Sequence, residues 1–213
     1  MPTGYKIAEQ DQLYYLTLQV VGWVDLFTRK SYRDLLIQNL AFCQQNKALE
    51  IFAFVIMSNH IHLLVKSNTG NLSNTIRDFK SFTSKELLKL IKEHGESRRE
   101  WMLEVFKNAA SQHIRNSEYQ LWTHENHAEH IYSNQFISQK INYIHENPVV
   151  AGIVIKAEDY PYSSAMNYAG VQGLLPVTVH DLNYSSGGLK SGGWPTGGIN
   201  SGKWQTGGWD TVK

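Results

Sequence analysis

The alternation of apolar and polar residues divides most of the chain into expected strands and helices. Short runs rich in apolar, β-branched and aromatic side chains predict strands, and longer runs with apolar residues every three or four positions predict helices. The expected strands are residues 13–21, 50–57, 60–66 and 120–124. The expected helices here are residues 31–45, with Ser31 as N-cap, and residues 71–93.

A further helix is expected around Tyr143. Isoleucines recur at helical spacing through this stretch, and Ser133 or Asn134 can cap its start. On the opposite face three polar side chains stack at i, i+4 and i+8, namely Gln139, Tyr143 and Asn147. Because a proline disfavours helical backbone in the residue before it, Pro148 predicts that the helix ends near Asn147.

This order of elements predicts an α+β fold. A strand–helix–strand–strand–helix–strand series followed by a helix matches the split βαβ antiparallel sheet, in the ferredoxin-like or RRM-like arrangement. That topology puts residues 60–66 on a central strand. The helix that carries Tyr143 must then pack across one face of the sheet.

His60 and His62 are the most informative candidates for chemistry. On a strand, residues two apart share a face, so both imidazoles should point the same way while Ile61 points into the core. Two neutral imidazoles on one face can hold a divalent metal. The alternative is a pair of histidines that serve only the core or the surface.

Tyr143 is the candidate nucleophile. A tyrosine on a helix, with the amide oxygen of Asn147 one turn further on, can act beside a metal ligand. His145 and Glu146 should point away from it, so neither is assigned as its base. The alternative is a polar stripe with a tyrosine at the edge of the core.

Composition bounds these hypotheses. The 213 residues allow one ordinary domain with an appendage, and the net charge is only +1. No run of about 18 apolar residues and no signal peptide is visible, so no membrane partner is expected. The single Cys43 excludes an internal disulfide and fits a reducing cytoplasm.

Basic residues are concentrated between Lys66 and Arg115. Arg77, Lys80 and Ser84 have helical spacing and can meet phosphates, although a solvated helix face has the same pattern. The candidates for contact with DNA are Arg77, Lys80, Arg98, Arg99 and Arg115.

Residues 186–210 repeat with a period of five, with one large apolar residue per unit, as in Ser191-Gly-Gly-Trp-Pro. The repeat is too rich in glycine to fold alone. We expect a catalytic domain over residues 1–182 and a Gly/Trp-rich tail over 183–213. The tail is either a flexible appendage or a segment whose tryptophans dock on the domain, a partner or nucleic-acid bases.

Together these motifs resemble a known family. Met57-Ser-Asn-His-Ile-His-Leu-Leu-Val65 is similar to the histidine block of the single-tyrosine (HUH) transposases. Tyr143-Ile-His-Glu-Asn-Pro-Val-Val-Ala-Gly-Ile-Val154 resembles the catalytic-tyrosine block of their REP-associated branch, and Tyr160-Pro-Tyr-Ser-Ser164 resembles the segment that follows it. The resemblance covers roughly residues 5–170.

The resemblance implies a metal-dependent transposase that cleaves and rejoins single-stranded DNA through a covalent 5′-phosphotyrosine. Tyr143 would be the nucleophile, and His60, His62 and Asn147 would bind Mg²⁺ or Mn²⁺. Gln139 would support the site on the tyrosine face. The implied partner is single-stranded or hairpin DNA in a bacterial cytoplasm, with a homodimer left open.

Two other interpretations remain at this point. One is a non-catalytic module that binds single-stranded nucleic acid on an RRM-like sheet, although that class carries aromatic residues where this chain has histidines. The other is a zinc site formed by the three regularly spaced residues His124, His127 and His130, which lacks a clear fourth ligand.

Overall fold

The computed structural model of the protein describes residues 6–93, 95–112 and 118–181. A four-stranded antiparallel sheet in the order β2-β3-β1-β4 forms its centre. The strands are β1 Tyr14–Gln19, β2 Leu49–Ile56, β3 His60–Ser67 and β4 Glu129–His130. The helices are α1 Lys30–Lys47, α2 Leu72–Glu93, α3 Arg99–Ser111, α4 Asn134–Val150 and the short α5 Ala165–Tyr168. This is the expected split βαβ topology, and the α+β fold class is confirmed.

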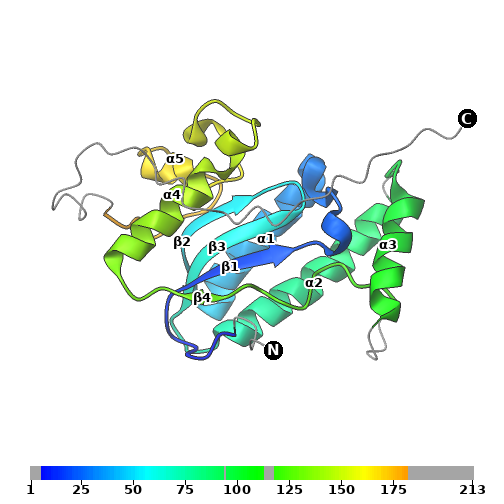
Figure 1. The fold of residues 1–213 in the computed structure, drawn as a ribbon, viewed down its shortest axis with the longest axis horizontal. Helices are drawn as coiled ribbons and strands as arrows, with labels where there is room; N and C mark the ends of the chain where they lie inside the picture. Colours follow the sequence, from blue (N-terminus) through cyan, green and yellow to red (C-terminus); the bar gives the residue numbers. More distant parts are fainter. Residues whose placement is uncertain (1–5, 94, 113–117, 182–213) are drawn as a thin grey trace, which may run out of the picture.

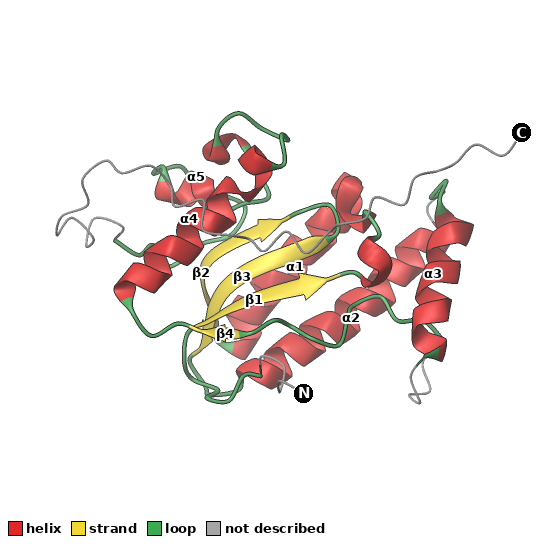
Figure 2. Ribbon diagram, in the orientation of Figure 1, coloured by secondary structure: helices red, strands yellow, loops and turns green. Residues whose placement is uncertain are grey.

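The sheet separates two layers. Figure 1 shows α1 and α2 behind the sheet, with α4 lying beside β2 and β3. Figure 2 shows the same arrangement by secondary structure, with α3 at the far end of α2. On β3 the apolar residues Ile61, Leu63 and Val65 are fully buried, as their alternation predicts.

The fourth strand was predicted at the wrong residues. The segment 120–124 forms only an isolated bridge, between Trp122 and Val20, and β4 begins at Glu129. Thr17 and Gln19 lie two residues apart on β1, but their backbone partners, Asn126 and Thr123, lie three apart. The extra residue interrupts the ladder as a bulge does, so this edge segment follows β1 without forming a regular strand.

Two predictions about helix ends were also wrong. α1 begins at Lys30 after Arg29, without a side-chain cap, so Ser31 is not the N-cap. α4 continues through Pro148 to Val150. A proline in the last turn removes only one hydrogen bond, so the helix tolerates it there.

Gly152 sets the real end of α4. Its φ is +69°, the left-handed conformation that favours glycine. Its N–H bonds to the carbonyl of Val149, and the N–H of Ile153 bonds to the carbonyl of Pro148. This pair of bonds is a Schellman motif, which satisfies the last carbonyls of the helix. At the other end Ser133 caps α4 as expected, since its Oγ accepts from the N–H of Phe136 at 3.2 Å.

Residues 162–164 cover the outer edge of β2 and anchor α4. The N–H of Ile56 donates to the carbonyl of Tyr162, and the N–H of Phe54 donates to Ser164 Oγ at 2.9 Å. His145, on the buried side of α4, places Nε2 2.8 Å from the same Oγ. Burial lowers the pKa of His145 to about 4, so the ring is neutral at pH 7. One buried hydroxyl thus joins the tyrosine helix to the sheet.

Replacement of Ser164 by Ala should therefore weaken the whole fold. The change leaves the Phe54 N–H and His145 Nε2 without this buried partner, which should lower the free energy of unfolding by about 1–3 kcal/mol. Urea unfolding followed by circular dichroism measures this. Ser111→Ala is the matched control, because its exposed hydroxyl bonds only within α3. Equal midpoints for the two variants would contradict the anchoring role.

Candidate active site

His60 and His62 lie on the same face of β3, as their spacing predicts. Their ring centroids are 4.6 Å apart, and His62 is only 4% exposed. Burial lowers the pKa of His60. The pKa of His62 is lowered further by burial, by His60 and by the nearby charge of Lys140. Both rings are therefore neutral at pH 7, which is the form that binds metal ions.

Neighbouring side chains orient both imidazoles through Nδ1. His60 Nδ1 lies 2.7 Å from Asn59 Oδ1, and an amide oxygen only accepts, so this nitrogen carries the proton. His62 Nδ1 lies 2.8 Å from the Tyr15 hydroxyl and 3.0 Å from Thr17 Oγ1. With Nδ1 engaged on each ring, Nε2 is the nitrogen available to a ligand.

Tyr143 lies beside this pair. α4 crosses β2 and β3, and the Tyr143 ring stands edge-on to His62 with a centroid distance of 5.4 Å. Tyr15 completes the cluster, at 6.1 Å from the Tyr143 ring. Tyr143 is 51% exposed, so a substrate can reach it. His145 points into the core instead, as expected.

Asn147 and Gln139, the other two candidates, have different surroundings on α4. Asn147 is partly buried and donates from Nδ2 to the carbonyl of Tyr143 at 3.3 Å. Within the described part of the chain, Gln139 is exposed and no hydrogen bond joins it to Tyr143 or the histidines. Over the same residues, no group of three or more His, Cys, Asp or Glu side chains could hold a metal ion. A third protein ligand would therefore be of another type, such as an amide.

The zinc interpretation fails for the same reason. His124, His127 and His130 form no metal group among the residues described. His130 packs its ring on Tyr14, whereas His127 lines the cavity next to His62. The irregular course of the edge segment spreads the three rings over different surroundings.

Several residues of the site were not among the candidates predicted from the sequence. A cavity of about 420 Å³ is lined by Tyr15, Thr17, Gln19, Trp23, His62, His127, Glu129, Lys140 and Tyr143. Lys140 Nζ lies 2.7 Å from Glu129 Oε2 and 4.2 Å from the centre of the Tyr15 ring. The alternation of polar residues on the first strand was a usable signal, because Thr17 pairs with His62 and Gln19 with His60.

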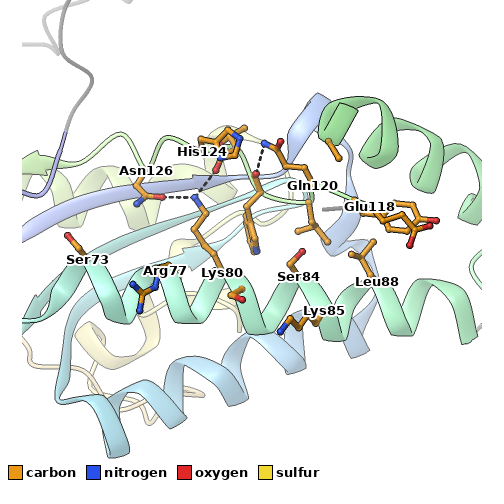
Figure 3. A pocket seen from close by; sticks show the side chains of 16 residues that line it. Ser73, Arg77, Lys80, Ser84, Lys85, Leu88, Glu118, Gln120, His124 and Asn126 are labelled. Atoms are coloured by element: carbon orange, nitrogen blue, oxygen red, sulfur yellow. Dashed lines mark hydrogen bonds between the residues drawn. The ribbon is translucent and has the colours of Figure 1, made fainter. Parts of the chain in front are cut away.

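Some of the basic candidates are bonded to other parts of the protein, and others are exposed. Figure 3 shows Arg77, Lys80 and Ser84 along one face of α2, beside a groove of about 500 Å³. The ammonium group of Lys80 is already bonded within the protein, since Nζ donates to the carbonyl of Thr123 and to Asn126 Oδ1, both at 2.7 Å. Burial lowers its pKa to about 8. Arg77 remains exposed, with an ion pair to the adjacent Asp78 at 3.1 Å.

The remaining basic candidates divide in the same way. The guanidinium group of Arg98 bonds to Glu96 and to Thr28 Oγ1, so its contacts stabilise the local structure. Arg99 is exposed and pairs loosely with Glu100 at 3.6 Å. Arg115 lies outside the described residues, as does the repeat at 186–210. Across the residues that the structure describes, no helix has the length and apolar character needed to span a membrane.

The fold and this geometry define a class of protein: a split βαβ sheet that presents paired histidines next to a tyrosine carried by a helix. The sequence model of the family described as "Transposase IS200 like" matches residues 24–112 of the chain. This stretch contains both histidines and ends before Tyr143. This match confirms the resemblance to a transposase family that was drawn from the sequence.

Solved structures match the fold as well. One is a REP-associated tyrosine transposase bound to a REP hairpin, with a TM-score of 0.54 and 18% sequence identity. The alignment covers 88% of this chain and 98% of that one. At this identity the likeness concerns the fold. No curated protein matches the chain.

Proposed function

We propose that this protein is a metal-dependent transposase that cleaves and rejoins single-stranded DNA, with Tyr143 as the nucleophile. The observation that carries the proposal is the 5.4 Å approach of the exposed Tyr143 ring to the neutral, oriented His62. The match of residues 24–112 to the transposase family model supports the reaction class. The REP-associated relative was solved with a DNA hairpin, which supports a hairpin-forming substrate.

The proposed reaction needs few groups. Tyr143 Oη attacks the phosphorus of a phosphodiester and gives up its proton, while the bond to the 3′-oxygen breaks and that oxygen gains a proton. The products are a 3′-hydroxyl and a 5′-phosphotyrosine. Rejoining is the reverse attack by a 3′-hydroxyl, so the bond energy is conserved and no nucleotide cofactor is needed.

The residues present fit a divalent cation. Nε2 of His60 and of His62 are the ligand atoms that the Nδ1 hydrogen bonds leave available. Asn147 uses its Nδ2 on the Tyr143 carbonyl, so its Oδ1 can serve as the third ligand. A bound Mg²⁺ or Mn²⁺ would polarise a non-bridging phosphate oxygen and stabilise the charge that develops there.

The tyrosine can be tested by removal of its hydroxyl. Tyr143→Phe should keep the fold and the affinity for DNA but lose the covalent adduct, with cleavage reduced on the order of a thousandfold or more. Incubation with labelled hairpin DNA and Mn²⁺, followed by denaturing electrophoresis, detects the adduct. Tyr132→Phe is the matched control, because Tyr132 is 80% exposed just before α4. Cleavage at the wild-type rate by the Tyr143→Phe variant would overturn the assignment of Tyr143 as the nucleophile, whereas DNA binding without cleavage by the wild type would leave only a nucleic-acid-binding module.

The histidines can be tested through metal binding. His60→Ala and His62→Ala should each reduce Mn²⁺ affinity and cleavage about 100-fold, and Asn147→Ala about tenfold, because an amide is the weaker ligand. Titration calorimetry measures binding, and cleavage with and without a chelator measures dependence. His130→Ala is the control, since this ring packs on Tyr14. Cleavage that survives the chelator would overturn the metal assignment.

The substrate form is a separate prediction. With a net charge of +1, the chain is poorly suited to hold long duplex DNA by phosphate contacts alone. It should prefer a single strand with a stem-loop over blunt duplex of the same sequence, with Arg77 and Arg99 among the phosphate contacts. Competition binding measures the preference, and equal or tighter duplex binding would refute it.

Deletion of residues 183–213 tests the proposed domain division. If these residues are only an appendage, the truncated protein should keep the preference for hairpin DNA. Loss of binding by the truncated protein would instead assign the Gly/Trp repeat to the DNA-binding surface.

A further inference from the structure

Trp23 is a large aromatic residue in an unusual backbone conformation at the mouth of the candidate site. Its φ of +54° lies in the left-handed region, which bulky residues rarely adopt. The preceding Gly22 has no room for a side chain, because a Cβ there would lie 2.8 Å from Cγ1 of Val105 on α3. In this strained turn the residue Trp23 is 52% exposed. Strain of this kind is typical of functional positions.

The turn that carries Trp23 is tied to the histidine pair. Asn59 Nδ2 donates to the carbonyl of Trp23 at 3.4 Å, while Asn59 Oδ1 accepts from His60 Nδ1. The Trp23 ring stands edge-on to His60, with a centroid distance of 6.5 Å and an interplanar angle of 76°. Asn59 thus orients the ring of His60 and also bonds to the backbone of the turn that carries Trp23.

Trp23 and Tyr143 border the same cavity. Both line the space of about 420 Å³ that also contains His62. A DNA strand whose phosphodiester reaches Tyr143 can place a flanking nucleotide against the walls of this cavity. In a single strand those bases are unpaired, and exposed aromatic rings bind unpaired bases by stacking with little regard to sequence.

We propose that Trp23 forms a stacking subsite for an unpaired nucleobase next to the cleaved phosphodiester. The inference rests on the proposed function and adds a residue that selects single strands over duplex. In a duplex the faces of the bases are stacked on one another, so no base face is available to stack on Trp23. Preference for single-stranded DNA would then depend on this side chain as well as on shape and charge.

Binding of two short probes tests the subsite. One probe is a single-stranded oligothymidylate of about 12 nucleotides, within the usual site size for such proteins, and the other is an abasic sugar–phosphate strand of equal length. The full chain should bind the oligothymidylate more tightly than the abasic strand. Trp23→Ala should weaken oligothymidylate binding about tenfold and leave abasic binding unchanged, while Trp23→Tyr should keep most of the affinity.

Trp101→Ala is the matched control. Trp101 is 51% exposed on α3 and does not line the cavity, so its loss should change neither affinity. Circular dichroism checks that each variant folds. Equal oligothymidylate binding by wild type and Trp23→Ala would overturn the subsite alone. Failure of the wild type to bind any single-stranded or hairpin DNA would overturn the proposed function. If Trp23→Ala changes only the oligomeric state in sedimentation, the side chain is a contact between protein copies and the subsite is wrong.

Discussion

The register of β1 against β3 is the constraint on which the candidate site depends. The pairing sets Thr17 opposite His62 and Gln19 opposite His60. Because side chains alternate along a strand, a slip of one residue would turn both imidazoles into the apolar layer under α1 and α2. Leu16 and Leu18 on β1 and Ile61 and Leu63 on β3 are fully buried and penalise such a slip. The packing of the apolar core thus determines the face of the sheet on which His60 and His62 lie.

The second requirement is the position of α4. A helix can slide along a sheet if only apolar contacts hold it, and a small displacement would separate Tyr143 from His62. Here the buried bond between His145 and Ser164 gives α4 a specific attachment, and Ser164 is itself bonded to Phe54 of β2. Directional bonds between buried groups are costly to break. The residues that position the tyrosine thus lie on the opposite side of the helix from the site.

The sequence predicted the regular parts of this structure because local pattern determines them. The His60/His62 face, the extent of α2 and the cap at Ser133 follow from periodicity and capping alone. Pro148 misled the prediction because the end of α4 is set by Gly152 four residues later. The bulged edge segment could not be predicted, since its hydrogen bonds depend on β1. α3 was missed although Met102, Phe106 and Ala110 have helical spacing and are buried.

The roles of Trp23, Tyr15 and Lys140 required the tertiary structure. Tyr15 and Trp23 lie near the start of the chain whereas Lys140 lies on α4, and each has an ordinary local pattern. The electrostatics of the cavity follow from the ionisable side chains that line or adjoin it. Both histidines are neutral, burial raises the pKa of the Tyr15 hydroxyl and keeps it protonated, and the charges of Lys140 and Glu129 offset each other. Side chains so nearly balanced in charge attract a phosphodiester only weakly. Under the proposed function, the attraction would therefore come from a cation on the histidines, and the binding of the bases from aromatic contacts such as Trp23.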